Sequence, residues 1–235
     1  MPTPRAVAVP GLGLTARGWT AVTEALHSAL PAVVVTLPAF GLPAPRGQAL
    51  DPASLADLLA ARIADQGLLA DGPVVLMGHS ASGQVVAEVA RRHPHAVRAL
   101  VLVGPTTDPR IAPRPRLVSR WLRTAAREDP RRVPEMLREY ATTRLSGFAR
   151  ALRAARRRDL RATLAATDVP VLVARGPHDR LATAGWAAAL AAVRPGVEVA
   201  TTARGAHMLP LTRPGELAGL VEAFSQRVCR DLPAG

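Results

Sequence analysis

The sequence lacks lysine and asparagine and contains a single cysteine, Cys229. One cysteine excludes an intrachain disulfide and argues against a metal cluster held by thiolates. No segment approaches the ~20 consecutive apolar residues that a membrane span needs. No long apolar stretch precedes the first turn, as a secretory signal would require. We therefore expect a cytoplasmic protein without a membrane partner.

Signals for a cofactor are also missing. The turn Gly11-Leu12-Gly13 follows an expected strand, but it lacks the third glycine of a dinucleotide-binding loop. Histidines and carboxylates do not recur at the spacings that metal sites use. We expect neither a cofactor nor a metal ion.

The positive charge is concentrated in one part of the chain. All 30 basic residues are arginine, against 18 acidic residues, for a net charge of +12. Residues 110–161 hold 16 arginines and 5 acidic residues, a net of +11, and the rest of the chain holds 14 and 13, a net of +1. The segment is either an entrance for a carboxylate, a phosphate or an acidic carrier protein, or a solvated surface whose arginine stems cover apolar area. Nucleic acid is not an expected partner, because the segment is short and shows no nucleic-acid motif.

Apolar runs alternate with helical patterns along most of the chain, which predicts βαβ units and one α/β domain. We expect a mostly parallel sheet of about six strands, at residues 5–9, 32–37, 73–77, 98–103, 169–174 and 197–202. The arginine-rich segment interrupts the alternation with helices expected around 117–128, 133–145 and 148–166. We interpret residues 1–104 and 169–235 as the two parts of the core, and residues 105–168 as a helical lid.

A sharp turn, Gly78-His79-Ser80-Ala81-Ser82-Gly83, joins the third strand to a helix. Such a turn projects a serine hydroxyl above the sheet, where a neighbouring base can activate it and backbone N–H groups can stabilise an oxyanion. We predict Ser80 as the nucleophile, with Gly78 and Ser82 small enough for strand and helix to approach. His79 is predicted to pack in the turn.

This turn resembles the G-x-S-x-G motif of the α/β-hydrolase superfamily, with Ser82 in place of the second glycine. The resemblance extends over nearly the whole chain and implies a helix-flanked sheet with a lid, similar to the small methylesterase and hydroxynitrile lyase members. It implies Asp179, after the fifth strand, as the triad acid, with Asp108 as the rival position. It also implies His207, in the loop before the last helix, as the base.

The turn after the first strand resembles the family's oxyanion loop. By that match, the backbone N–H groups of Leu12 and Ala81 are the expected oxyanion donors. The substrate contacts we predict are Gly11, Trp121, Tyr140 and Met208. Of the apolar lid residues Trp121, Met136, Leu137 and Tyr140, most are expected in the lid core and one or two at the pocket.

Three functions remain open on these residues. The first is a serine hydrolase that cleaves an ester or related acyl bond of a small, anionic or carrier-bound molecule through an acyl-enzyme. The second is a lyase, cyclase or acyl transferase of bacterial specialised metabolism, because relatives use the same triad for other reactions. The third is a non-catalytic ligand-binding scaffold, which has no need for three reactive groups in loops.

Overall fold

A computed structural model of the chain describes residues 5–26, 30–106, 108–109, 114–141 and 145–231. Six parallel strands form one sheet in the order β2-β1-β5-β6-β7-β8, which confirms the expected sheet. The strands are β1 Ala6–Val9, β2 Ala32–Val34, β5 Val74–His79, β6 Val97–Val103, β7 Val171–Arg175 and β8 Val197–Thr201. The strand expected over 32–37 ends at Val34, and a separate two-stranded sheet follows, formed by β3 Leu37–Pro38 and β4 Gly41–Leu42.

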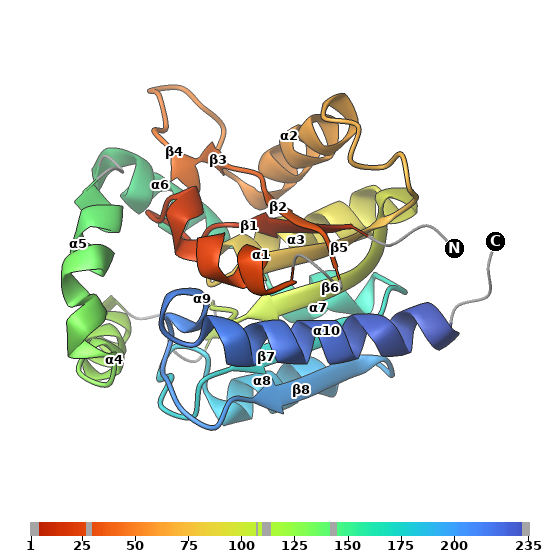
Figure 1. The fold of residues 1–235 in the computed structure, drawn as a ribbon. Helices are drawn as coiled ribbons and strands as arrows, with labels where there is room; N and C mark the ends of the chain where they lie inside the picture. Colours follow the sequence, from red (N-terminus) through yellow and green to blue (C-terminus); the bar gives the residue numbers. More distant parts are fainter. Residues whose placement is uncertain (1–4, 27–29, 107, 110–113, 142–144, 232–235) are drawn as a thin grey trace.

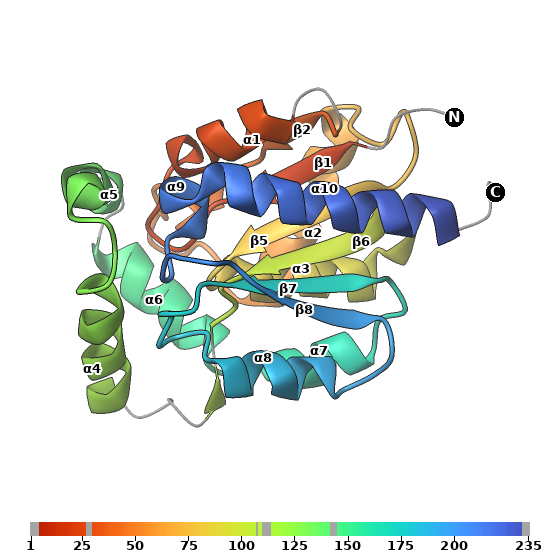
Figure 2. The same ribbon diagram turned by 60° about the horizontal axis from the view of Figure 1, so that its bottom comes forward.

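Helices cover both faces of the sheet (Figures 1 and 2). One face carries α1 Thr20–Leu26 and α10 Pro214–Asp231, and the other carries α2 Pro52–Asp65, α3 Ser82–Arg92, α7 Leu160–Ala165 and α8 Ala184–Ala191. Shorter helical turns are η1 Ala16–Trp19, η2 Pro94–Ala96 and α9 Leu209–Thr212. Within the described ranges, no helix has both the length and the apolar character needed to cross a bilayer.

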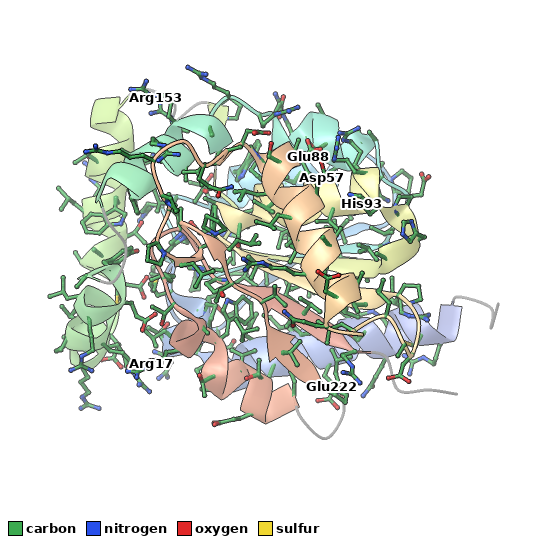
Figure 3. All side chains as sticks on the ribbon, turned by 90° about the horizontal axis from the view of Figure 1, so that it is seen from above. Arg17, Asp57, Glu88, His93, Arg153 and Glu222 are labelled. Atoms are coloured by element: carbon green, nitrogen blue, oxygen red, sulfur yellow. The ribbon has the colours of Figure 1, made fainter. Side chains whose placement is uncertain are left out.

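The central strands are apolar on both sides because each side faces a helical layer. In β5, Leu76 packs toward α2 and α3, whereas its neighbour Met77 packs toward α1 and α10. This alternation follows from the two-residue period of a strand. The α2–α3 pair is also held by Asp57, whose carboxylate bonds Arg92 and His93 (Figure 3).

Helix α2 begins at Pro52, directly after a capping aspartate. The carboxylate of Asp51 accepts from the backbone N–H of Ser54, and Pro52 occupies the first turn. A capping carboxylate satisfies a backbone donor that a helix N-terminus otherwise leaves free. The helical segment after the first strand begins as η1 and continues as α1 to Leu26.

The arginine-rich segment forms α4 Arg114–Ala125, η4 Pro130–Arg132, α5 Val133–Ala141 and α6 Leu145–Ala155. The single helix expected over 148–166 is wrong: α6 ends at Ala155 and α7 begins at Leu160, because Asp159 caps the new helix by accepting from Arg161 N–H. Helices α4, α5 and α6 lie together beside the end at which the parallel strands terminate, at the left of Figures 1 and 2. Their role as a lid stays a prediction.

Candidate active site

Ser80 lies in the tight turn between β5 and α3. Its backbone has φ +58°, a left-handed conformation that costs a non-glycine residue about 1–3 kcal/mol. The turn also needs Gly78, because a Cβ there would lie 2.7 Å from Cγ2 of Val86 and 3.0 Å from the backbone of the helix. The strained conformation directs the Ser80 side chain toward the cavity described below.

Ser82, which replaces the second glycine of the motif, is fully buried. Its Oγ lies 3.0 Å from the carbonyl oxygen of Val9 and 2.9 Å from that of His79. One hydroxyl hydrogen serves these two acceptors, so the side chain connects the end of β1 to the turn that carries Ser80. The polar group that the substitution adds is therefore hydrogen-bonded.

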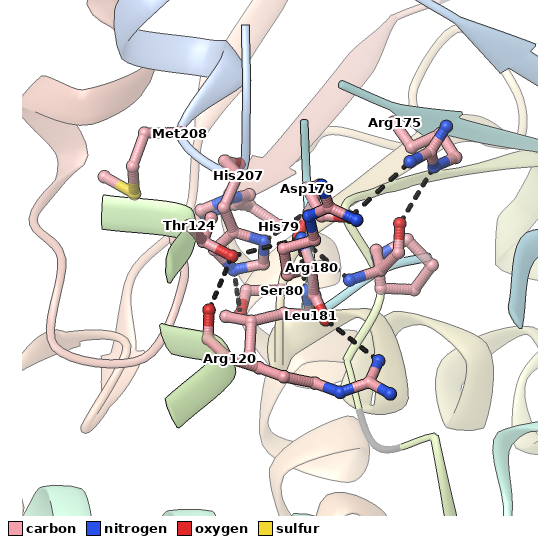
Figure 4. A network of polar contacts seen from close by, with 12 residues as sticks. His79, Ser80, Arg120, Thr124, Arg175, Asp179, Arg180, Leu181, His207 and Met208 are labelled. Carbon is pink, nitrogen blue, oxygen red and sulfur yellow. Dashed lines mark hydrogen bonds and ion pairs between the residues drawn. The ribbon is translucent and has the colours of Figure 1, made fainter. Parts of the chain in front are cut away.

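Three loops bring Ser80, His207 and Asp179 into one line (Figure 4). Nε2 of His207 lies 2.9 Å from Oγ of Ser80, and Nδ1 lies 2.8 Å from Oδ2 of Asp179. Because a carboxylate only accepts, the Nδ1–H donates to Asp179 and the lone pair of Nε2 faces the serine hydroxyl. This is the arrangement in which a histidine can remove a serine proton.

The Asp179 carboxylate is held by its own loop. Oδ1 accepts from the backbone N–H groups of Leu181 and Ala182 at 2.8 and 2.9 Å. Burial raises the pKa of Asp179, but the His207 charge and these hydrogen bonds outweigh burial and hold the pKa below its usual value. Asp179 is therefore ionised at neutral pH.

A glycine allows the acid loop to approach the histidine loop. A Cβ at Gly176 would collide with the backbone oxygens of Gly205 and Ala206. Arg175 also fixes the acid loop, because its buried Nε donates to the Ala182 carbonyl at 2.9 Å. The alternative acid, Asp108, lies at the cavity wall, whereas Asp179 is the carboxylate in contact with His207.

The pKa values of the two neighbouring histidines move in opposite directions. Burial lowers the pKa of His207, but the Asp179 carboxylate outweighs it and raises the pKa above its usual value. Burial and the nearby His207 lower the pKa of His79 to about 3, so that ring is neutral. Nε2–H of His79 donates to the His207 carbonyl oxygen at 2.9 Å, which fits the predicted packing role.

Leu12 and Ala81 lie beside Ser80 in the cavity wall. Within the described part of the chain, no group accepts a hydrogen bond from either backbone N–H. The turn that carries Leu12 is shaped by Gly13, whose φ is +78° and whose N–H donates to the Ala39 carbonyl at 3.0 Å. The two free N–H groups are thus available to an oxygen of a substrate.

A cavity of about 770 Å³ opens in front of Ser80 and His207. Its wall is mostly apolar, and one side carries arginines; the lining residues are Leu12, Ser80, Ala81, Thr106, Asp108, Pro109, Val118, Trp121, Leu137, Tyr140, Phe148, Leu152, Arg156, Arg157, Arg158, Asp159, Arg161, Leu181 and His207. The cavity lies between the core and α4, α5 and α6, which supply much of the wall.

Two of the four predicted substrate contacts, Trp121 and Tyr140, line this cavity. The other two do not: Met208 is buried in an apolar cluster with Leu14 and Met136, and Gly11 packs against the His79 ring. Leu137 also lines the cavity, and it is 64% exposed rather than part of the lid core.

Two site residues were missed by the sequence reasoning because nothing local in the sequence distinguishes them. Oε1 of Glu128, just after α4, accepts from the backbone N–H groups of His207 and Met208 at 2.7 and 2.9 Å. Oε2 of Glu139, in α5, accepts from the backbone N–H and hydroxyl of Thr15 at 2.7 and 2.6 Å. Both carboxylates are buried and connect the arginine-rich segment to loops of the core.

A third connection comes from α4. Thr124 Oγ1 accepts from the backbone N–H of Arg180 at 3.1 Å, and Arg120 donates to the Arg180 carbonyl at 3.3 Å (Figure 4). Arg180 directly follows Asp179, so α4 contacts the acid loop, while Glu128 just after this helix contacts the histidine loop. Among the residues with defined positions, no three His, Cys, Asp or Glu side chains gather as a metal site would require.

Comparison with known proteins identifies relatives over nearly the whole chain. The sequence profile of the "Alpha/beta hydrolase family" matches residues 6–220. The chain is 27% identical over 248 aligned positions to the pimeloyl-[acyl-carrier protein] methyl ester esterase of Citrobacter koseri, covering 94% of each protein. The protein of the same name from Aromatoleum aromaticum is 36% identical over 112 residues, which are 48% of this chain and 40% of that protein.

Solved structures share the fold at low sequence identity. A thermophilic esterase from Thermogutta terrifontis superposes with a TM-score of 0.76 at 22% identity, covering 96% of this chain and 90% of that one. E-2-(acetamidomethylene)succinate hydrolase gives a TM-score of 0.75 at 18% identity, with coverages of 95% and 91%. At these identities the likeness shows the fold alone.

Proposed function

The chain belongs to the α/β hydrolase family, and on that premise we propose that it is a serine esterase with Ser80 as nucleophile, His207 as base and Asp179 as acid. The observation that carries the proposal is the hydrogen-bonded line from Ser80 Oγ through His207 to Asp179, at 2.9 and 2.8 Å. The esterase names of its relatives favour hydrolysis over elimination, cyclisation or acyl transfer.

The reaction proceeds in two halves. His207 Nε2 takes the proton of Ser80 Oγ as Oγ bonds to the acyl carbon, and the alcohol then leaves with that proton. Water attacks the acyl-enzyme, again losing its proton to Nε2, and the acid leaves as Ser80 regains its hydrogen. Asp179 stays ionised throughout and stabilises the imidazolium that forms in each half.

The oxyanion of each tetrahedral intermediate is proposed to bind the backbone N–H groups of Leu12 and Ala81. Neither donor is used elsewhere among the residues that the structure describes, so both are oriented without an internal competitor. Losing one such donor typically costs about 10²–10³ in rate.

The cavity suggests the substrate class. Its apolar wall suits an acyl chain, and the guanidinium groups of Arg156 and Arg157 form no hydrogen bond or ion pair with any described residue. By contrast, Arg161 is paired with Asp159 at 2.7 Å. We propose an acyl ester with an anionic group, such as a carboxylate, that reaches these two arginines.

The anionic group can belong to a small molecule or to an acidic carrier. The two named relatives are esterases of a methyl ester on an acyl-carrier protein. The net charge of +11 over residues 110–161 would attract an acidic carrier at long range. A carrier-bound ester is therefore part of the substrate class we propose.

A fluorophosphonate probe tests the nucleophile. We expect labelling at Ser80 in the wild type and none in S80A, together with turnover of short p-nitrophenyl esters. Prompt labelling without turnover of any ester would contradict hydrolysis and favour a lyase or transferase. Absence of labelling would contradict catalysis by Ser80 and leave a ligand-binding scaffold.

Paired substrates test the anionic group. A half-ester of a dicarboxylic acid and a neutral ester of the same chain length are compared in the wild type and in R156Q/R157Q. We expect the double variant to lose kcat/KM for the half-ester selectively. R153Q is the matched control, because Arg153 is an exposed arginine near the end of α6, just before Arg156 and Arg157, and does not line the cavity (Figure 3). An equal loss for both esters would contradict the proposed anion subsite.

A further inference from the structure

Glu128 occupies an unusual position for an acid in an arginine-rich segment. It is only 6% exposed, and its Oε1 accepts two hydrogen bonds, from the backbone N–H groups of His207 and Met208. These donors lie 79 and 80 residues further along the chain. Within the described ranges, its Oε2 has no hydrogen-bond partner.

A buried carboxylate is costly unless it is well bonded. Three other acids of the arginine-rich segment have local partners near the surface. Asp129 and Asp159 cap short helical elements, and Glu135 pairs with Arg132. Glu128 instead makes two charge-assisted bonds to the loop of the proposed base. Its location therefore points to a role in that loop rather than in the charge balance of the segment.

The backbone of His207 is held from two sides. Its N–H donates to Glu128 at 2.7 Å, and its carbonyl oxygen accepts from His79 Nε2–H at 2.9 Å. An imidazole attached to a backbone fixed at both ends has little freedom to leave the line between Ser80 and Asp179. Because Glu128 belongs to the segment over the cavity, the position of that segment and the position of the imidazole are linked.

We infer that Glu128 is a positioning residue. It holds the His207 loop in its reactive position only while the arginine-rich segment, which carries Glu128, packs on the core. The inference rests on the proposed function of His207. It makes the docking of α4 a condition for an effective base. The bond from Arg180 N–H to Thr124 in α4 provides the same link for the acid loop.

Glu128 also acts on His207 through its charge. The ionisable groups that face His207 are Asp179 after β7, His79 at the end of β5, and Glu128 after α4. Asp179 and Glu128 both raise the pKa of His207 against the effect of burial. Burial raises the pKa of Glu128 itself, opposed by the two backbone donors. Burial also raises the pKa of the Tyr140 phenol, and the Glu128 charge adds to that effect.

The test separates geometry from charge with two variants. E128Q keeps an acceptor oxygen for the two N–H groups but removes the charge, whereas E128A removes both. E139Q is the matched control, because Glu139 is also buried and accepts from the backbone, but at Thr15. E135Q controls for loss of a surface charge on α5.

The first measurement is an NMR titration of the His207 ring in an S80A background, which does not depend on activity. We expect E128Q to shift the midpoint to lower pH, and E139Q and E135Q to leave it in place. An unchanged midpoint in E128Q would overturn the electrostatic part of the inference. This titration remains decisive even if the wild type is never labelled and the proposed function fails.

The second measurement is the rate of fluorophosphonate labelling, alongside thermal unfolding of each variant. We expect labelling to fall about 10²-fold in E128A, as a small displacement of a reacting group does, and to be largely restored in E128Q. The acid limb of the pH profile should shift to lower pH in E128Q. Labelling of E128A at the wild-type rate would overturn the positioning role. If E128A does not fold, the pH profile of E128Q becomes the deciding measurement, and an acid limb that stays in place would contradict the inference.

Discussion

The Asp179→Asn substitution tests the triad because the structure fixes how the new amide must lie. Oδ1 of Asp179 accepts from the N–H groups of Leu181 and Ala182. In the substituted side chain, only the amide oxygen can accept these bonds, so the NH₂ group must face Nδ1 of His207. Two donors cannot bond each other, and the imidazole must carry its hydrogen on Nε2 instead.

In that tautomer, the nitrogen facing Ser80 has no lone pair to accept the hydroxyl proton. The loss expected for a wrong tautomer in a Ser-His-Asp triad is about 10⁴ in kcat, which corresponds to about 5 kcal/mol of transition-state stabilisation. The backbone bonds of the acid loop are kept, so we expect the fold to persist. The rate loss therefore reports on chemistry rather than on unfolding.

The assay compares kcat/KM and fluorophosphonate labelling for the wild type, D179N and D108N, with circular dichroism to monitor folding. D108N is the control because Asp108 is the rival acid and lines the cavity without occupying the place of Asp179 beside His207. We expect its loss to fall well short of that in D179N. A loss below about 10-fold in D179N, or a larger loss in D108N, would refute the assignment of the acid.

Two further predictions concern stability. Ser82→Ala removes the hydroxyl that bonds the Val9 and His79 carbonyls. We expect the free energy of unfolding, measured by urea titration, to fall by about 1–3 kcal/mol. An unchanged urea midpoint would show that the hydroxyl adds no stability. The pKa of His79 is about 3 when folded and 6.5 in the reference state, so the folded protein binds fewer protons between these values. The contribution of His79 to the unfolding free energy is therefore largest above pH 6.5. As the pH falls from 6.5 toward 3, that contribution decreases by at most about 1.4 kcal/mol per pH unit. His79→Gln should flatten the decline of unfolding free energy below pH 6.5, and a slope equal to that of the wild type would contradict a buried neutral ring.

The sheet could be predicted from the sequence because its information is local. Each central strand is a short apolar run bounded by turns, and six such runs correspond to the six strands of the sheet. The turn around Ser80 is also local, since Gly78 and the small residues after it allow strand and helix to approach closely. Family resemblance then placed His207 and Asp179 in loops that converge because parallel strands end at one edge.

Other features required the tertiary structure. Helix α6 ends before α7 because Asp159 caps a new helix, while the apolar pattern continues across the break. Met208 follows His207 directly, yet it packs beneath α5 with Met136 rather than in the cavity wall. Periodicity indicates which face of a helix is apolar, but it does not indicate what that face packs against.

The sequence by itself determined the strands, the order of the reactive loops and the concentration of positive charge. Only the tertiary structure decided which of two aspartates contacts His207, which arginines line the cavity, and that Glu128 and Glu139 hold core loops. The reason is physical: local patterns record the preferences of neighbouring residues. A hydrogen bond between groups 79 or 124 residues apart exists only after the chain has packed.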